Sequence, residues 1–326
     1  MKTLKFYSLF LIITLLGCTE ENYYTTAEGL GKVNVYIEGD ITNAEAQAQL
    51  EEEVGSITEN IFIQNTSQLT NLNISVPIYI RKILFSNCES LINISISGQG
   101  TAMPFTEISV GGPNAQNITI NGITELSDLG ISGAVNNATH LICNDLIKIK
   151  NYFGFSFNHL YENTAKLNDL KYASTPNGYC TLEGKFSVLE FNALKELPNS
   201  DFSITIDEFS LPSLQNATSL IFGYYGYLGI STLNFPSLTR CDNVYLRNDY
   251  DTAINVYMPL LNYCLTYQSR GIELESSSIN SILHQFLNIQ PSSGKSLFFE
   301  DSAQPTGQGL IDKQTLINQG NTVTIY

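Results

Sequence analysis

Tyrosine is the residue type whose placement points most directly to binding chemistry. Eight of the eighteen tyrosines fall between residues 224 and 267, and the stretch GYYGYLG at 223–229 sets three of them among glycines. A tyrosine ring offers a flat apolar face and a hydroxyl, which suits sugar rings and protein surfaces alike. The chain has no tryptophan to take that role. The alternative is that many of these tyrosines only line the walls of the fold. The ligand-binding residues that we expect are Tyr224, Tyr225, Tyr227, Tyr245 and Tyr250.

Histidine and carboxylate placement gives little support for catalysis. Histidine occurs only at positions 140, 159 and 284, and no GxSxG, HExxH or phosphate-loop motif is present. Two acidic side chains held about 5–9 Å apart could cleave a glycosidic bond. The candidates are Asp207, Glu208, Asp242, Asp249, Asp251, Glu273 and Glu275. A solvated acidic face explains them more simply, so we expect no catalytic residues and no enzyme, with polysaccharide cleavage as the alternative.

Cysteine usage predicts neither a metal site nor a cofactor. Five cysteines follow Cys18, at positions 88, 143, 180, 241 and 264, and no CxxC pair or Cys/His cluster occurs. Cys241 and Cys264 each stand six residues after the start of a related motif, FPSL and MPLL. This spacing predicts Cα atoms about 5 Å apart, within disulfide range. Two stacked, buried thiols are the alternative that we prefer.

The N-terminal residues have the order of a secretory signal peptide. Lys2 and Lys5 precede an apolar run from Phe6 to Leu16, which is shorter than the ~20 residues that span a bilayer. The sequence then reads Leu-Leu-Gly-Cys at 15–18, which resembles a bacterial lipobox. We expect a signal peptide at 1–17, a lipid on Cys18 as the membrane contact, and a polar tether at 18–30. A short buried helix with a chance cysteine is the alternative.

The charge balance excludes one class of partner. The chain carries a formal net charge of −15 and no cluster of basic residues. Such a chain repels polyanions, so we expect no nucleic-acid binding.

An internal repeat predicts the elements that position these residues. Residues 59–75 align with residues 81–97 at an offset of 22, and identical residues meet at six positions, for example Ile61 with Ile83 and Asn71 with Asn93. Short β-branched and aromatic runs bounded by Asn, Gly and Ser indicate strands. A unit of this length cannot bury its apolar face alone, so neighbouring units would stack about 4.8 Å apart as parallel coils.

An apolar-x-x-apolar anchor extends this periodicity to about residue 282. It recurs at steps of 20 to 24 residues, with one longer step of 35, as LTNL (69), LINI (91), LSDL (126), LIKI (146), LNDL (167), FNAL (191), LPSL (211), FPSL (235), MPLL (258) and INSI (279). The prolines of LPSL, FPSL and MPLL would stand where a strand begins, since no ladder hydrogen bond is lost there.

Both ends of the stack need a cap, because an open sheet edge invites aggregation. At 31–58 we expect a strand (32–41) and a helix (42–54) whose N-cap is Thr42 or Asn43. The coils would occupy 59–290. At 291–326 we expect a strand (295–300), a helix (312–320) closed by Gly320, and a last strand.

The chain resembles the surface leucine-rich-repeat lipoproteins of Bacteroidetes, and the receptor L-domain and BspA-like proteins. The resemblance lies in LPSL, FPSL and MPLL, in SITENIFIQN (56–65) and in GQGLIDKQTLINQGNTVTIY (307–326), where Asn321 stands in place of a frequent tryptophan. It implies a mainly β, irregular leucine-rich-repeat or β-helix-like solenoid with short terminal caps. The acidic Glu20 and Glu21 also resemble the export signal that places such lipoproteins on the cell surface.

The resemblance further implies a lipid-anchored outer-membrane protein, exposed at the cell surface, with a non-catalytic binding or adhesion role. A host protein, a matrix component or a glycan would be the ligand. A β-helix-type carbohydrate-active enzyme and a structural component of the envelope are the alternatives. The tripeptides DTA at 251 and DSA at 301 resemble the acceptor pattern of O-linked glycans in these bacteria, with Thr252 and Ser302 as the modified residues.

Overall fold

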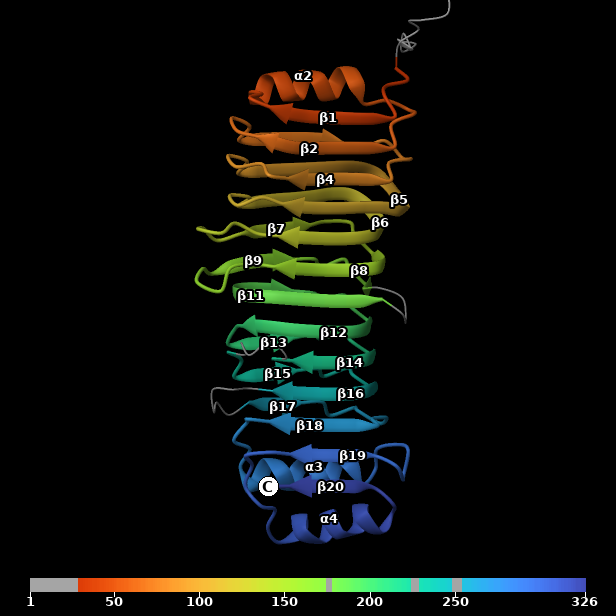
Figure 1. Cartoon of the computed structure of the whole chain (residues 1–326). Helices are drawn as coiled ribbons and strands as arrows, with labels where there is room; N and C mark the ends of the chain where they lie inside the picture. Colours follow the sequence, from red (N-terminus) through yellow and green to blue (C-terminus); the bar gives the residue numbers. More distant parts are fainter. Residues whose placement is uncertain (1–28, 174–177, 224–228, 248–253) are drawn as a thin grey trace, which may run out of the picture.

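The computed structural model of the chain describes residues 29–173, 178–223, 229–247 and 254–326. It is 49% strand and 12% helix, and the strand pairings are parallel. The prediction of a mainly β chain with parallel strands is confirmed. Figure 1 shows the strands lying one above another along the molecule, with α2 (Asn43–Glu53) at one end and α3 (Ser276–Phe286) and α4 (Gln308–Asn318) toward the other.

One ladder of parallel pairings, here named the long ladder, runs along the whole molecule. In most of its strands alternate residues are buried, so one face packs on the core and the other lies at the surface. In β12, by contrast, residues Ser200 to Ile204 are all buried. Its strands are β1 (Asn34–Gly39), β2 (Asn60–Thr66), β4 (Lys82–Ser86), parts of β5 (Asn93–Gly111), β6 (Asn117–Ser132), β8 (Lys148–Ser156), β11 (Tyr179–Glu190) and β12 (Glu196–Thr205), then β14 (Asn216–Phe222), β16 (Arg240–Arg247), β18 (Thr266–Arg270), β19 (Ser296–Phe299) and β20 (Thr322–Ile325).

A second ladder alternates with the long ladder along the chain. It contains β3 (Asn71–Ser75), the first parts of β5 and β6, β7 (His140–Cys143), β9 (Asn163–Lys166) and the end of β11. A separate sheet follows, made of β13 (Glu208–Ser210), β15 (Thr232–Asn234) and β17 (Asn255–Tyr257). In chain order, α2 precedes the second ladder, and α3 and α4 follow the separate sheet.

The short strand β10 (Tyr172–Ala173) pairs with the first residues of β8 and with Glu196 at the start of β12, so it bridges two strands of the long ladder. Because β6 and β11 each take part in both ladders, seven strands form a closed circuit of parallel pairings, in the order β6, β8, β10, β12, β11, β9, β7. The prediction of separate coils did not include this ring.

The repeat at offset 22 has the predicted register in both ladders. Ile61 pairs with Ile83 between β2 and β4, and Ile74 pairs with Ile96 between β3 and β5. All four side chains are buried in one continuous apolar core. Identical side chains thus stack on one another from strand to strand.

The anchor motifs, by contrast, do not occupy one equivalent position. Leu69 and Leu91 come shortly before the second-ladder segments, whereas INSI lies within α3, which the sequence did not predict as a helix. LPSL, FPSL and MPLL each form a turn in which the last residue donates its N–H to the first carbonyl at 3.2 Å. Their prolines stand at the second turn position, where a fixed φ is favourable. Their prediction as strand starts was wrong.

The terminal elements lie close to the predicted ranges. Thr42 caps α2 through a reciprocal pair of contacts with Glu45. At the other end β19 and β20 match the predicted strands, while α4 begins at Gln308, four residues before the predicted start.

Cys241 and Cys264 are free, buried thiols, as preferred. Each donates its S–H to a backbone carbonyl, of Asn243 and Thr266 respectively. Burial raises the pKa of both thiols, that of Cys264 to about 12, so neither is a ready nucleophile.

Candidate functional site

A groove of about 520 Å³ crosses the outer face of the long ladder from β5 to β12, and we name it the central groove. In each of the five strands one apolar residue points into the core, and the residues before and after it point outward. The inward residues are Val110, Ile131, Phe155, Leu182 and Phe202. Five strands at about 4.8 Å spacing give the groove a length of about 19 Å. Two outward rows line it, Ser109–Gly130–Gly154–Thr181–Asp201 and Gly111–Ser132–Ser156–Glu183–Ser203.

Tyr152 provides an aromatic surface within the central groove. A Cβ on Gly154 would collide with the Tyr152 hydroxyl, so the phenol lies across this glycine. Its hydroxyl is 3.1 Å from Oγ1 of Thr181, and the residue is 41% exposed. Gly154 therefore lets the ring lie against the sheet while part of it remains open to a ligand.

Asp201 closes the groove at β12. The residue is only 4% exposed, and the Tyr179 hydroxyl donates to its Oδ2 at 3.5 Å. Among the described residues no donor reaches its Oδ1, and the buried hydroxyl of Ser203 beside it has no partner either. Burial raises the pKa of Asp201 to about 6, and the charge of Glu183 acts in the same direction.

Glu183 forms the rim next to Asp201. The Ser156 hydroxyl donates to its Oε2 at 3.0 Å, and Nε2 of His159 lies 3.5 Å from its Oε1. Since Thr181 pairs with Asp201 and Glu183 pairs with Ser203, the two acidic residues are diagonal neighbours on adjacent strands.

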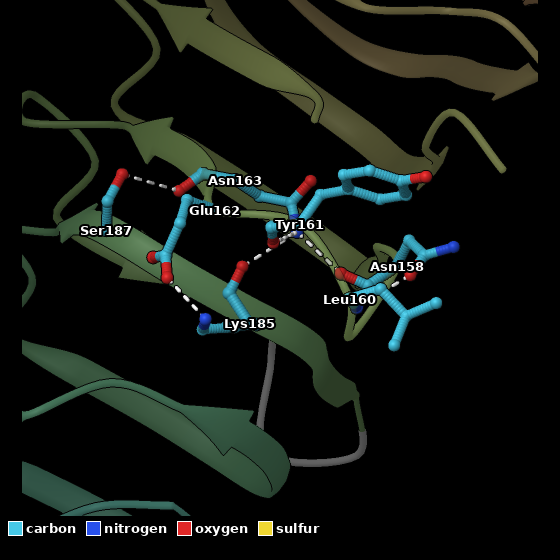
Figure 2. Close-up of polar contacts among 7 residues, drawn as sticks. All are labelled: Asn158, Leu160, Tyr161, Glu162, Asn163, Lys185 and Ser187. Carbon is cyan, nitrogen blue, oxygen red and sulfur yellow. Dashed lines mark hydrogen bonds and ion pairs between the residues drawn. The ribbon is translucent and has the colours of Figure 1, made fainter. Parts of the chain in front are cut away.

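A buried asparagine holds the corner that carries His159. Figure 2 shows Asn163 at the start of β9, behind the corner that contains Asn158, Leu160 and Tyr161. The two N–H groups of its Nδ2 are shared among the carbonyls of Asn158, Tyr161 and Lys185, whose oxygens lie 2.7–2.9 Å away. These bonds satisfy the carbonyls of an irregular corner, so the corner keeps one shape at the rim of the groove.

A second groove, of about 300 Å³, lies on the same ladder toward the C-terminus, and we name it the arginine groove. Tyr245, Arg247, Gln268 and Arg270 line it. The Arg270 guanidinium lies over the Phe298 ring at 4.8 Å from its centroid, which fixes the direction of this cation. Its Nε also lies 3.8 Å from Oε2 of Glu300, so this cation already has an acidic neighbour.

The predicted site residues meet different outcomes. Tyr245 lines the arginine groove, whereas Cys18, Tyr224, Tyr225, Tyr227, Tyr250 and Thr252 lie outside the described residues, as do Asp249 and Asp251. The Ser302 hydroxyl is half-buried and donates to the carbonyls of Ile272 and Glu300. A glycan on Ser302 would have to break both bonds.

Several other candidate side chains are already engaged with partners. Glu208 accepts a hydrogen bond from Asn234, and Asp242 pairs with Arg240 at 2.8 Å. Within the described residues no three His, Cys, Asp or Glu side chains converge as a metal site requires.

The central groove escaped the sequence analysis, although a signal for it exists. Two outward residues flank a buried one in SVG (109), GIS (130), GFS (154), TLE (181) and DFS (201), at steps of 20 to 27 residues. The outward residues of these tripeptides are mostly small or polar, so a search for apolar periodicity does not detect them. Only the register of the paired strands shows that they lie side by side and form the floor of the groove.

Comparison with known proteins finds no family model, curated protein or solved structure that matches the chain. In the part of the chain that the structure describes, none of the helices is long and apolar enough to cross a membrane.

Proposed function

We propose that this chain is a lipid-anchored surface protein, a solenoid of parallel coils that binds a glycan in the central groove. The solenoid is supported by ladders that repeat at the length of one coil, as in the 22-residue offset between β2 and β4. The anchor at Cys18, and a place on the outer membrane facing outward, are supported by the sequence pattern at 1–21. The resemblance to leucine-rich-repeat lipoproteins of Bacteroidetes supports the same assignment.

Asp201 is the observation that carries the binding proposal. A buried acceptor without a donor costs about 1–3 kcal/mol, so proteins rarely keep one without a reason. Here the unpaired oxygen belongs to a residue that lines the groove beside Glu183, and both this oxygen and the unpaired hydroxyl of Ser203 are buried at its β12 end. A ligand hydroxyl that donates to Asp201 and accepts from Ser203 would remove both deficits.

A glycan fits this groove better than a protein surface does. Sugars bring many hydroxyls for carboxylate and serine partners and an apolar ring face for Tyr152. Protein interfaces usually bury aromatic and arginine anchors in a core depleted of acidic residues. The central groove instead has two carboxylates and a floor of glycine and serine.

One observation favours a second function, cleavage of the bound polysaccharide. Asp201, with its pKa raised to about 6, suits a general acid, and Glu183 is a second carboxylate close by. A carbohydrate-active enzyme would release reducing ends from a polysaccharide. Replacing either carboxylate by its amide would abolish that release.

A glycan array tests the binding proposal. We expect saturable binding that falls by about tenfold or more in Tyr152→Ala, since a ring contact of this size contributes about 1–3 kcal/mol. The matched control is Tyr257→Ala on β17, which is 56% exposed and lies outside both grooves. Equal binding by both variants would contradict the proposal. Co-purification with envelope proteins without any glycan binding would favour the structural alternative.

Two glycine variants test the floor of the groove separately. Gly154→Ala should displace the Tyr152 ring and weaken glycan binding, because the new methyl group takes the space of the phenol. Gly130→Ala is the control, since its Cβ would meet Tyr152 at an ordinary 3.6 Å. The same affinity for both variants would show that the position of Tyr152 does not matter for binding.

A further inference from the structure

The N-terminal end of the molecule exposes a large apolar groove of about 1030 Å³ that the proposed glycan binding does not use. We name it the apolar groove. Phe105 is 81% and Tyr79 73% exposed, and three aliphatic side chains beside them are 44–47% exposed, namely Val33, Ile57 and Ile78. A contiguous apolar surface of this kind marks a contact with a partner or a membrane.

Cations stand at the edge of the apolar groove. Nζ of Lys150 lies 5.2 Å above the Phe105 ring, and the Arg81 side chain lines the groove and is 68% exposed. Each cation also has an acidic partner: Nζ of Lys150 lies 3.3 Å from Oε1 of Glu125, and Nε of Arg81 lies 3.5 Å from Oε2 of Glu59. Aromatic rings flanked by long cationic side chains are typical of surfaces that lie at the boundary between lipid headgroups and acyl chains.

The course of the chain limits what can cover the groove. Leu30 is 41% exposed and stands three residues before Val33, which lines the groove. Cys18, the proposed site of lipid attachment, precedes Leu30 by twelve residues. A fully extended chain of this length spans at most about 40 Å. The anchor would therefore keep the apolar groove close to a bilayer at all times.

We propose that the apolar groove docks on the lipid surface, with Phe105 and Tyr79 inserted between headgroups. This inference rests on the proposed lipid anchor. The anchor supplies one membrane contact and the groove supplies a second, which fixes the orientation of the molecule as well as its location.

Tryptophan fluorescence tests this contact, because the chain contains no tryptophan. The full-length, lipid-modified variant Phe105→Trp is placed in vesicles that contain brominated phosphatidylcholine, which quenches indole emission at the acyl boundary. We expect a blue shift and a loss of intensity. The matched control is Leu160→Trp, at a position that is also 81% exposed but lies in the corner between β8 and β9. It should keep its emission.

Vesicle flotation separates the two proposals. If the Phe105→Trp variant floats with vesicles while its indole emission stays unquenched, the anchor holds and the docking is overturned. A chain that does not float overturns both. If the apolar groove holds a second copy of the chain instead, light scattering would show a dimer in detergent that the double variant Tyr79→Ser, Phe105→Ser abolishes, and this result would also overturn the docking on lipid.

Discussion

At the scale of single residues, Asp201 couples stability to pH. Its folded pKa of about 6 lies above the ordinary value of 3.8, so the folded chain holds this proton more tightly than the unfolded chain does. The stabilisation is therefore complete below pH 3.8 and is lost as pH rises through about 6. An ionised Asp201 thus opposes folding at neutral pH.

Asp201→Asn should raise the free energy of unfolding at pH 7.5, by roughly 3 kcal/mol at most, because a shift of about two pKa units corresponds to that energy. Below pH 4 the variant and the parent chain should be equally stable. Urea denaturation at both pH values measures the difference. A variant that is less stable at pH 7.5 would mean that the ionised Asp201 is stabilised in the folded chain by more than its contact with Tyr179.

The same carboxyl predicts how binding depends on pH. A ligand hydroxyl that donates to Asp201 favours the ionised form, so affinity should increase as pH rises from 5 to 7. Titration calorimetry with a glycan identified on the array would measure this dependence. Asp201→Asn should bind with an affinity that does not change over this range. A parent chain with a flat profile would exclude Asp201 as an acceptor for the ligand.

At the scale of elements, the corner between β8 and β9 depends on one amide. Asn163→Ala would leave the carbonyls of Asn158, Tyr161 and Lys185 without this donor. We expect a loss of about 3 kcal/mol or more in the free energy of unfolding, since each unpaired buried acceptor costs about 1–3 kcal/mol. Chemical denaturation measures it. The control, Asn144→Ala, removes one exposed contact with Asn121 and should cost under about 0.5 kcal/mol.

The elements also show how far the sequence predicts this fold. The pairing of β2 with β4 could be predicted because Ile61 and Ile83 share an identical neighbourhood. The anchor series failed because apolar-x-x-apolar suits three structures equally: a turn such as Leu211–Leu214, the approach to a strand at Leu69, and adjacent turns of helix at Ile279–Ile282. The spacing alone does not distinguish them.

The candidate site was less predictable than the fold. Among the expected binding tyrosines, Tyr245 lines the arginine groove, and the other four lie outside the described residues. Aromatic content alone does not reveal which side of a strand a ring occupies. Tyr267, in the same stretch, is fully buried. Asp201 and Glu183 become neighbours only through the register of β11 and β12.

At the scale of the whole molecule, stability should be regional. If the coils stack as proposed, each contacts mainly its neighbours, so damage to one end need not spread. Leu50→Asp replaces a buried apolar side chain of α2 with a charged one. It should lower the free energy of opening the N-terminal strands by about 3–5 kcal/mol. Hydrogen exchange should show faster exchange in β1 to β3 and no change in β16 to β20. Ala48→Asp, at an exposed position of α2, is the control. A uniform loss of protection would contradict the regional model.

The matched register of Ile61 and Ile83 has an evolutionary consequence. An excision that joins Asn60 directly to Ile83 would remove 22 residues yet leave each remaining strand opposite a suitable neighbour. Unequal recombination within such a gene would therefore lengthen or shorten the protein by whole 22-residue units. The helices near its two ends would stay unaltered. Relatives that differ in size by multiples of this increment are the expected trace of that process.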